Sequence, residues 1–340
     1  MKNPLLVALP DATVNKSDWP WIKEPLLIPD MLQNGQSWPL VTVVTPSYNQ
    51  AQFLEATIRS VLLQGYPNLE YMVIDGGSTD GSLEIISQYA DRLDYWVSEN
   101  DRGQSHAINK GLARAKGSIL GWLNSDDVLL PGAISRVVAA FQEHPDADVV
   151  YGHLERIDAQ GQRVGTPNLP KDRVVFDKTL ALDESVVNQA GCFWRRGMME
   201  KVGFLNEGLH YCMDYEYWTR ILLVGGKFIR LNDTLAQFRL SSDSKTVGQT
   251  AKMAYEGLQV IDGFFVKPDI AERFGLSSSQ LRKQANRGRS SVSLHAFYGC
   301  MKEKRWAEAV RWFVRAHIYD PLAVFRRKWL TLAIARVMRK

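Results

Sequence analysis

The sequence has few cysteines and no long apolar run. Its three cysteines, Cys192, Cys212 and Cys300, are scattered and odd in number. This pattern excludes a disulfide framework and the paired spacing of a zinc site, and it fits a reducing compartment. No stretch is apolar enough to span a bilayer. The apolar run at residues 5–9 is too short for a signal peptide and is bracketed by prolines, so we expect a cytoplasmic protein.

The composition is that of a folded protein, but its charge is unevenly distributed. Of the 340 residues, 45% are hydrophobic and 23% are charged, which does not favour disorder. Residues 282–340 contain 15 Lys and Arg against 3 Asp and Glu, whereas residues 1–281 contain 26 against 34. A basic C-terminal region on an acidic body suggests a polyanionic partner, such as a membrane surface, nucleic acid or an acidic polymer.

Apolar runs and helical spacing alternate through the first half of the chain. Strands are predicted at residues 40–44, 71–74, 95–98 and 119–123, with helices at 53–63, 82–89 and around 107–112 between them. This order predicts an α/β fold with a Rossmann-like, mostly parallel central sheet flanked by helices.

The flanking regions differ from this pattern. Residues 1–38 are rich in proline and tryptophan and are predicted to be an extended arm that packs on the body. Further helices are predicted at 132–142, 198–202 and 215–224, and strands at 149–152, 189–195, 227–231 and 234–239, with a hairpin at 154–162. From residue 252 onward the spacing is helical. The sequence therefore divides into an arm (1–38), an α/β domain (39–250) and a basic helical C-terminal region (251–340).

Acidic residues follow two of the predicted strands directly. The second strand ends in Asp75 and a glycine-rich turn, and the fourth ends in Asn124, Ser125, Asp126 and Asp127. Open α/β sheets bind ligands at the carboxyl ends of their strands. Carboxylates there suit Mg²⁺ or Mn²⁺, which usually also bind a substrate's phosphates. The alternative for each stretch is an acidic turn with capping aspartates, but together they favour a nucleotide-diphosphate site.

Five ordered motifs in residues 38–245 resemble those of the family-2 glycosyltransferases. Each motif is weak alone, but their order and spacing are specific. The resemblance implies an inverting, nucleotide-sugar-dependent enzyme of the hexosyltransferase type with a GT-A fold, to which the helical C-terminal region predicted from spacing is an extension. The motifs are Thr45-Pro46-Ser47-Tyr48-Asn49, Asp75-Gly76-Gly77-Ser78-Thr79-Asp80-Gly81-Ser82, Asp101 to Gly111, Asn124-Ser125-Asp126-Asp127 and Met213-Asp214-Tyr215-Glu216-Tyr217-Trp218.

The resemblance also implies roles for individual residues. The metal ligand is Asp126, with help from Asp127, and the cofactor is a divalent cation, Mn²⁺ or Mg²⁺. Asp214 matches the position of the catalytic base. The residues assigned to the nucleotide are Pro46, Tyr48, Asn49, Asp75, Gln104, Asn109, Asn124 and Ser125, with Tyr48 stacking on the base and Asp75 bonding to a pyrimidine ring.

Elementary chemistry supports these roles. A nucleoside diphosphate leaves readily only if its developing charge is neutralised, as a divalent ion can do. Inversion needs a carboxylate to accept the proton of the attacking hydroxyl, which contributes roughly 10²–10⁴-fold to the rate. The alternative for Asp214 is an acid at a helix N-terminus, where the helix dipole stabilises its negative charge. The alternative for Tyr48 is packing in the core.

Two departures from the family pattern affect the site. Asn124 stands where many members have Asp, so the metal would depend more on Asp126. Ser241 stands where the family often has a metal-binding His, so Arg239 and Lys245 become the candidates for diphosphate contacts. The Gln-x-x-Arg-Trp signature of processive synthases and their membrane spans are absent, which favours a single-addition enzyme.

The expected reaction is transfer from a UDP-sugar to a hydroxyl of a glycan or lipid-linked acceptor in surface polysaccharide or cell-envelope glycan synthesis. The alternatives are a nucleotidyltransferase and a non-catalytic nucleotide-sugar-binding scaffold protein. Residues 322–340 place an apolar stripe among six basic residues. This pattern is typical of a helix in a membrane interface and predicts peripheral binding to an anionic membrane surface at the inner face of the cell membrane. The alternatives are packing on the body and an oligomer contact, and no nucleic-acid partner is expected.

Overall fold

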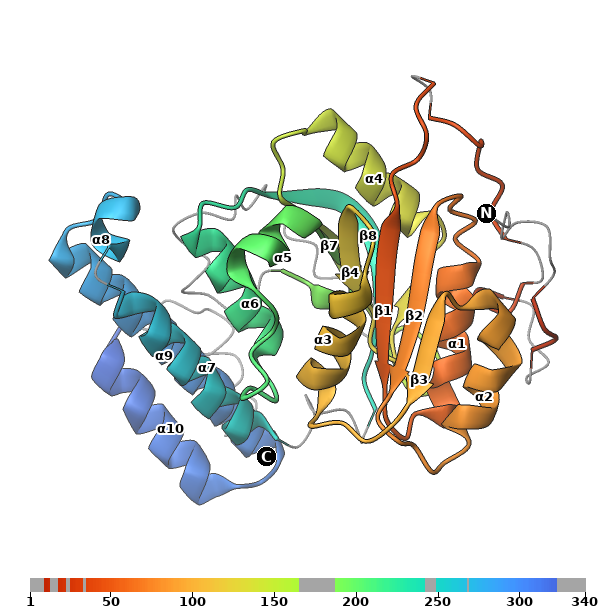
Figure 1. The fold of residues 1–340 in the computed structure, drawn as a ribbon. Helices are drawn as coiled ribbons and strands as arrows, with labels where there is room; N and C mark the ends of the chain where they lie inside the picture. The colour runs from red at the N-terminus through yellow and green to blue at the C-terminus, as the bar shows by residue number, and fades with distance from the viewer. Residues whose placement is uncertain are drawn as a thin grey trace. The chain divides into compact units, whose positions relative to one another are not determined.

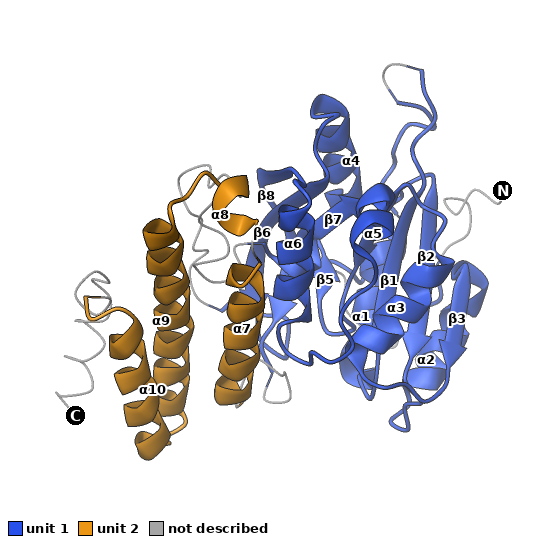
Figure 2. Cartoon of the chain, turned by 60° about the vertical axis from the view of Figure 1, so that its left-hand side comes forward, with its two compact units in different colours: residues 1–175, 187–241 blue, residues 176–186, 242–340 orange. Residues whose placement is uncertain are grey.

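The computed structural model describes residues 9–12, 18–22, 25–32, 35–164, 187–241, 249–267 and 269–322. The chain forms two compact units, shown in separate colours in Figure 2. Unit 1 comprises residues 1–175 and 187–241, and unit 2 comprises residues 176–186 and 242–340.

Among the described residues, unit 1 contains an eight-stranded sheet in the order β3-β2-β1-β4-β7-β6-β8-β5. The four strands from β3 to β4 are parallel, β7 is antiparallel to both of its neighbours, β6 and β8 are parallel, and β5 is antiparallel to β8. The predicted α/β class is therefore confirmed, with the parallel character concentrated in the first half. The strands are β1 Val41–Ser47, β2 Leu69–Asp75, β3 Tyr95–Ser98, β4 Ile119–Trp122, β5 Val128–Leu129, β6 Val149–Ile157, β7 Cys192–Arg195 and β8 Phe228–Arg239.

Helices cover both faces of this sheet (Figure 1). Alternate residues of β1 and β2 pack with α1, α2 and α4 in one large apolar core, since successive strand residues point to opposite faces. Figure 1 shows α3, α5 and α6 on the opposite side from α1 and α2. The helices of unit 1 are α1 Ala51–Leu62, α2 Ser82–Tyr89, α3 Gln104–Arg114, α4 Ala133–Glu143, α5 Arg196–Val202 and α6 Met213–Leu223.

Helix α3 lies very close to β1. A Cβ atom at Gly111 of α3 would lie 2.4 Å from Cγ1 of Val44 in β1. Only glycine permits this approach, so the second half of α3 packs closely on β1.

A buried cation, Arg59, binds several carbonyls of the N-terminal arm. The guanidinium of Arg59 on α1 donates hydrogen bonds to the carbonyls of Pro10 (2.8 Å), Pro20 (3.1 Å) and Ile22 (2.9 Å). It also bonds to Tyr89 Oη at 3.0 Å, and Arg59 is 1% exposed. The arm is thus bound to α1 through polar backbone groups that surround a buried charge.

Unit 2 is helical, and the predicted helical C-terminal region is confirmed. Its longest helix, α9, begins with a capping box formed by Ser277 and Gln280. Buried residues of α7, α9 and α10, including Phe297 and Trp312, form a separate apolar core. None of the described helices is long and apolar enough to cross a membrane. The helices are α7 Thr250–Phe265, α8 Ile270–Arg273, α9 Ser278–Lys302 and α10 Trp306–Tyr319.

Several element predictions need correction. The two strands predicted at 227–231 and 234–239 are one strand, β8, and Gln189–Gly191 form a short 3-10 helix before β7 rather than part of the strand. Predictions for residues 323–340 lie outside the described residues.

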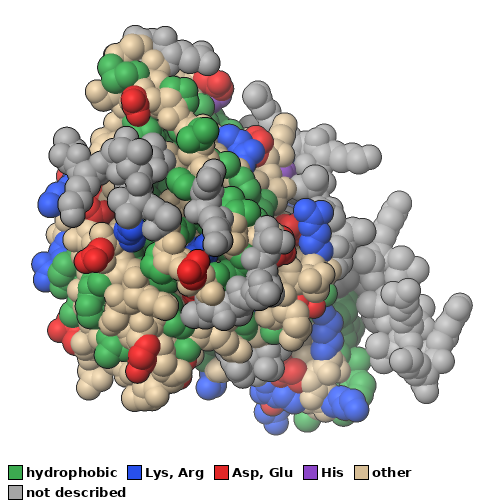
Figure 3. Space-filling view, turned by 90° about the vertical axis from the view of Figure 1, so that its right-hand side faces the viewer, with side chains coloured by type: hydrophobic (Ala, Val, Ile, Leu, Met, Phe, Trp, Pro, Cys, Tyr) green, Lys and Arg blue, Asp and Glu red, His purple; other side chains and the backbone are tan. Residues whose placement is uncertain are grey.

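On the face shown in Figure 3, acidic and basic side chains of the described residues are scattered among apolar and polar atoms.

Candidate active site

The carboxyl ends of the parallel strands are aligned, which places the predicted motifs together. Ser47 of β1 pairs with Asp75 of β2, and Asp75 pairs with Ser98 of β3. The N–H of Leu123, just after β4, donates to the carbonyl of Val44 in β1 at 2.9 Å. The loops after β1, β2, β3 and β4 therefore emerge at one edge of the sheet, where open α/β sheets bind ligands.

The loop after β1 presents an aromatic ring to solvent. Tyr48 is 62% exposed, whereas Pro46 is buried within β1. Asn49 has a φ of 51°, and its side-chain oxygen accepts from the N–H of Thr79 at 2.9 Å, while its own N–H donates to Ser78 Oγ at 2.8 Å. Asn49 thus connects the loops after β1 and β2. The neighbouring side chain of Tyr48 remains exposed to solvent. Core packing of Tyr48 is not observed.

Asp75 is occupied by its own loop. Its Oδ2 accepts from the N–H groups of Gly77 (3.0 Å) and Ser78 (2.9 Å) and from Ser98 Oγ (2.7 Å). Its Oδ1 accepts from Ser78 Oγ at 2.5 Å, and Asp75 is fully buried. A carboxylate with four donors and no exposure shapes the turn after β2, and it has little capacity left for a nucleotide base.

The two polar residues predicted on α3 have different surroundings. Gln104, in the first turn, donates from Nε2 to Asn124 Oδ1 at 2.7 Å. Asn109 is 9% exposed, and its Nδ2 donates to Leu205 O (3.0 Å) and Glu207 Oε1 (3.1 Å). Its Oδ1 accepts from the N–H of Leu205 at 3.0 Å. Gln104 therefore lies beside the acidic loop, whereas Asn109 holds residues 205–207 against α3.

A chain of amides organises the loop after β4. Asn124 donates from Nδ2 to Gln189 Oε1 at 3.1 Å, and Gln189 Nε2 donates to the carbonyl of Trp122 at 2.7 Å. Ser125 follows and is buried. The sequence prediction missed Gln189, because nothing in the spacing places a residue 65 positions away beside Asn124. Its only signal is a polar residue just before a buried strand.

Asp126 and Asp127 differ in exposure and partners. Asp126 is partly exposed, whereas Asp127 is fully buried and its Oδ1 accepts from the N–H of Arg239 at 3.0 Å. Asp127 Oδ2 is buried without a hydrogen-bond partner. Burial, and then the charge of Asp126, raise the pKa of the Asp127 carboxyl. Of the two adjacent acids, Asp126 is therefore the one that presents a carboxylate to solvent.

Arg239 lies beneath this loop. Its guanidinium donates to the carbonyls of Asp126 (2.9 Å), Asp158 (2.8 Å) and Ala159 (3.3 Å), and it lies 4.6 Å from the ring of Phe53. Arg239 is 5% exposed, so it fastens the acidic loop to the turn after β6. The other residue predicted for the diphosphate, Lys245, lies outside the described residues.

Asp214 lies at the start of α6 with a perturbed acidity. Burial raises the pKa of the Asp214 carboxyl to about 6, against the opposing effect of the Tyr215 N–H, which donates to Oδ1 at 2.7 Å. Its charge contributes to the raised pKa of the buried Cys192 thiol on β7, after the larger effect of burial. Asp214 therefore lies near the strand β7 and is a carboxylate that titrates close to neutral pH.

Aromatic rings join α6 to the sheet. Trp218, one turn after Asp214, stacks on Trp122 of β4 with ring centroids 5.6 Å apart and an interplanar angle of 8°. Trp194 of β7 and Tyr217 pack edge-on against this pair. Because Trp122 is two residues before Asn124, this aromatic cluster (Trp122, Trp194, Tyr217 and Trp218) ties the helix of Asp214 to the strand that carries the acidic loop.

Comparisons with known proteins agree with this arrangement. Residues 42–203 match the model of Glycosyl transferase family 2. A PGL/p-HBAD biosynthesis glycosyltransferase of Mycobacterium bovis is 30% identical over 53% of this chain and 68% of its own length. The chain belongs to glycosyl transferase family 2. This family-2 glycosyltransferase is also 29% identical to an uncharacterised glycosyltransferase of Rickettsia typhi, over 70% of this chain and 74% of that protein.

Other similar proteins extend the comparison. The putative teichuronic acid biosynthesis glycosyltransferase TuaG of Bacillus subtilis is 29% identical over 61% of this glycosyltransferase and 81% of its own length. S. aureus TarS in complex with UDP superimposes with a TM-score of 0.59 at 19% identity, covering 87% of each chain. The mannosyltransferase PcManGT of Pyrobaculum calidifontis, in complex with GDP-Man and Mn²⁺, gives 0.53 at 18% identity, over 91% and 92%. The predicted GT-A fold is confirmed by this likeness.

The acidic loop of this glycosyltransferase fits a divalent cation. Among the described residues, no group of three or more His, Cys, Asp and Glu side chains could hold a metal. Mg²⁺ and Mn²⁺ are nevertheless often bound by one or two carboxylates together with substrate phosphates. Asp126 is the partly exposed acid, and the unpartnered Asp127 Oδ2 shows that the loop retains acceptor capacity. The donor set therefore suits a cation that arrives with a diphosphate.

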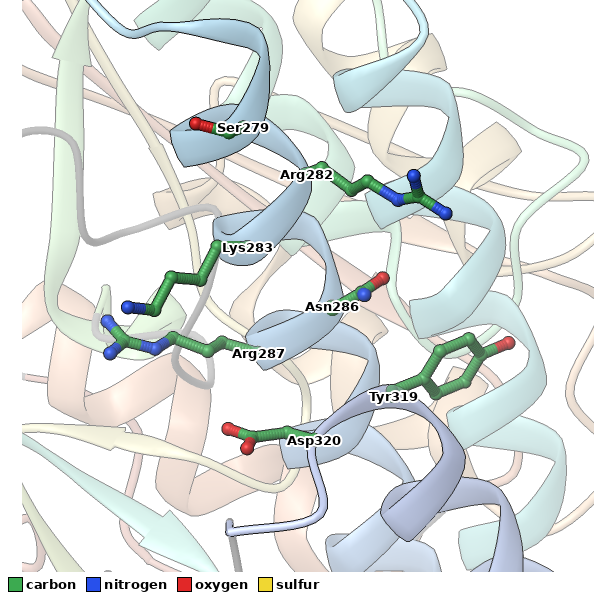
Figure 4. Close-up of a pocket in the computed structure, with 7 residues that line it drawn as sticks. All are labelled: Ser279, Arg282, Lys283, Asn286, Arg287, Tyr319 and Asp320. Atoms are coloured by element: carbon green, nitrogen blue, oxygen red, sulfur yellow. The ribbon is translucent and has the colours of Figure 1, made fainter.

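Unit 2 of the glycosyltransferase has a hollow of about 310 Å³ along α9. In Figure 4, Lys283 and Arg287 extend to one side of α9, and Arg282 and Tyr319 lie on the other, while Asp320 also lines the hollow. The three basic side chains form no ion pair with a described residue. The hollow therefore combines excess positive charge with an aromatic ring.

Proposed function

We propose that this glycosyltransferase transfers a sugar, with inversion, from a nucleotide-diphosphate sugar to a hydroxyl of a glycan or lipid-linked acceptor. The donor we favour is a UDP-sugar, and the transferred group is a hexose. The observation that carries the proposal is Asp214: a partly buried carboxyl whose pKa is raised to about 6, on a helix that packs on the strand leading to the acidic loop.

Asp214 suits the role of general base in this reaction. A base works best when its pKa lies near the operating pH, because it is then ionised yet still a competent proton acceptor. At neutral pH most Asp214 side chains are ionised and accept the proton of the attacking hydroxyl. The rings of Trp122 and Trp218 fix the helix on the sheet and limit the positions the carboxylate adopts.

The donor's leaving group would be bound at the loop after β4. A divalent cation held by Asp126, with Asp127 beside it, would neutralise the charge that develops on the departing nucleoside diphosphate. Gln104, Asn124 and Gln189 form a hydrogen-bonded chain that orients this loop, and Asn124 is placed to contact a ribose hydroxyl. The complexes of the similarly folded TarS with UDP and PcManGT with GDP-Man and Mn²⁺ support a nucleotide-sugar donor and a divalent cation.

We propose the acceptor from the names of two relatives and from the basic residues of the C-terminal region. TuaG and the M. bovis relative have names that refer to teichuronic acid and to PGL/p-HBAD biosynthesis, so we place this enzyme in cell-envelope glycan synthesis. The basic side chains of the hollow on α9 and the basic residues 322–340 suit an anionic or lipid-linked acceptor at a membrane surface. We therefore propose a peripheral location at the inner face of the cell membrane.

The test is donor hydrolysis and transfer by the full chain with Mn²⁺. UDP-sugars and GDP-sugars are screened for release of nucleoside diphosphate, and the anomeric configuration of the product is read by NMR. Release of UDP that disappears in Asp214→Asn, with donor binding retained, supports the proposal. Release of pyrophosphate would instead indicate a nucleotidyltransferase, and binding of donors without turnover would indicate a scaffold protein. Retention of configuration would overturn the inverting mechanism.

A further inference from the structure

The segment 205–209 is bound to helix α3 by two side chains of that helix. Asn109 accepts a hydrogen bond from the N–H of Leu205 and donates one to its carbonyl, both at 3.0 Å. Ser105 Oγ donates to the carbonyl of Leu209 at 3.3 Å. Both leucines are buried, so the segment lies against the body of unit 1 rather than in solvent.

Glu207 extends this attachment to the loop after β3. Its Oε1 accepts from Asn109 Nδ2 at 3.1 Å, and its Oε2 accepts from Arg102 Nη2 at 2.6 Å and Nε at 3.1 Å. Arg102 lies two residues before Gln104, whose Nε2 donates to Asn124 Oδ1 in the acidic loop. One carboxylate thus joins the segment 205–209 to the side of the site where the donor's leaving group would be bound.

Arg220 attaches the chain just before this segment to helix α6. Its guanidinium donates to the carbonyls of Val202 (2.5 Å) and Phe204 (2.7 Å), and to Glu216 Oε1 of the same helix at 2.8 Å. Helix α6 carries Asp214 in its first turn and lies on the same side of the sheet as α3 (Figure 1). The segment 205–209 therefore connects the helix that contacts the acidic loop to the helix that carries the proposed base.

The ion pair of Arg102 and Glu207 is too exposed to stabilise the fold strongly. The side chain of Arg102 is 69% exposed and that of Glu207 is 31% exposed. Ion pairs in such surroundings contribute little to the free energy of unfolding. The pair does restrict where the attached segment can lie, and a misplacement of about 1 Å can slow a reaction by about 10²-fold. A contact that matters little for stability can therefore matter for the rate.

We propose that Glu207 is a positioning residue for the transfer reaction. By holding the segment 205–209 on Arg102 and Asn109, it sets the place of Asp214 relative to the bound donor. The proposal rests on the proposed function, in which Asp214 is the base. Glu207 acts through the position of that base and takes no part in the proton transfer itself.

The experiment compares the full chain with Glu207→Ala in Mn²⁺, below the unfolding temperature of both. Turnover is measured with the nucleotide sugar that the wild type uses fastest, and binding is measured by calorimetry with UDP. In the variant kcat should fall about tenfold to a hundredfold, whereas the Kd for UDP should stay within about twofold, because the acidic loop is intact.

The pH dependence of kcat gives a second readout. Burial raises the pKa of Asp214 to about 6, so the wild-type rate should rise with pH through that value. A segment that is no longer held on α3 admits water to this carboxyl, and the midpoint of the Glu207→Ala profile should move to lower pH. Loss of an ion pair that is only structural would lower Tm and leave the midpoint unchanged.

Two further variants control for charge and for the partner. Glu200→Ala is the matched control, because it removes an exposed ion pair with Arg196 within α5 (3.2 Å) and should keep the wild-type kcat and midpoint. Arg102→Gln should slow turnover, yet it should add little in the Glu207→Ala background, because Arg102 acts through Glu207. If Glu207→Ala does not fold, Glu207→Gln, which keeps an acceptor for Asn109, replaces it in each measurement.

The outcomes separate this inference from the proposed function. Wild-type protein that turns over no nucleotide sugar overturns the proposed function, and the role of Glu207 with it. Wild-type turnover that Glu207→Ala retains in full overturns the inference alone. Equal losses of UDP affinity and kcat would assign Glu207 to the donor site instead of the base, and additive losses from Arg102→Gln and Glu207→Ala would show that the two side chains do not act together.

Discussion

Replacing Asp214 by Asn should increase stability while it abolishes catalysis. The folded protein raises the pKa of this carboxyl from 3.8 to about 6, chiefly because burial removes water from the charged form. Between pH 4 and pH 6 the folded state therefore keeps a proton that the unfolded chain has released. Stability falls as pH rises through this window, and the full cost remains above it. Asn cannot ionise, so the variant does not incur this cost.

The magnitude follows from the shift. About two pKa units at 1.36 kcal/mol each give about 3 kcal/mol, an upper bound because the side chain is partly exposed. Integrated over pH, the advantage of Asp214→Asn grows from less than about 1 kcal/mol near pH 4 to about 3 kcal/mol above pH 7. For a domain of this size that corresponds to a rise in Tm of roughly 2–4 °C per kcal/mol.

The assay is thermal unfolding of wild type and variant across pH 4–8, with transfer rates measured in parallel. The variant's turnover should fall by roughly 10²-fold or more, and the wild-type rate should rise up to about pH 6 and then level off. Glu216→Gln is the control on the same helix. It removes a carboxylate that pairs with Arg220 at 2.8 Å, so it should lower stability slightly rather than raise it.

One result would refute the reasoning. If Asp214→Asn is less stable than wild type above pH 7, the carboxylate is a stabilising acid at the N-terminus of α6, favoured by the helix dipole. An advantage that does not vary with pH would likewise show that ionisation of Asp214 in the folded state carries no cost.

Three further predictions concern the metal, the loop and the C-terminal region. Asp126→Ala should lose nearly all transfer in Mn²⁺ while its Tm is retained, and near-normal turnover would exclude Asp126 as the metal ligand. Asn109→Ala removes three hydrogen bonds to residues 205–207 and should lower stability by about 1–3 kcal/mol, measured by thermal unfolding, since it leaves a buried N–H and carbonyl unpaired; an unchanged Tm would contradict the loop-holding role. Truncation after Asp320 should reduce sedimentation with anionic liposomes at low salt, and equal sedimentation of both forms would remove the membrane role of residues 322–340.

The sequence predicted the parallel half of the sheet well and the other half less well. Apolar runs bounded by turns identified β1, β2 and β4, which are buried on both faces, and the partly buried edge strand β3. The pair Asn232-Asp233 suggested a turn, yet β8 continues through it, and β6 accommodates it with register shifts at His153. Pairing partners also lie far apart in the chain, so β7 between β4 and β6 was not predictable from local pattern.

The candidate site shows a similar limit. The sequence identified the loops that meet at the sheet edge, because motifs follow strand ends. It did not distinguish a partly exposed aspartate from one that accepts hydrogen bonds from its own turn, since the direction of a side chain depends on the folded loop. Asp75 and Asn109 were assigned to the nucleotide, but their polar atoms are engaged by neighbouring protein groups. The positions of Glu207 and Gln189 relative to these loops became visible only in the fold.

The hydrogen bonds between Arg59 and the N-terminal arm have a consequence for N-terminal truncation of this protein. The carbonyls of Pro10, Pro20 and Ile22 accept hydrogen bonds from the guanidinium of Arg59, in place of the water that would surround it in an unfolded chain. A protein expressed from residue 39 onward would contain every motif of the catalytic family, yet it would leave that guanidinium without three of its acceptors. Deletion of the arm opens this guanidinium to water, so the loss is that of hydrogen bonds to a charged group, each worth about 1.5–3 kcal/mol, and of the packing that the arm provides. A chain that lacks these arm residues should therefore be less stable than the full chain, which thermal unfolding of the two forms would measure.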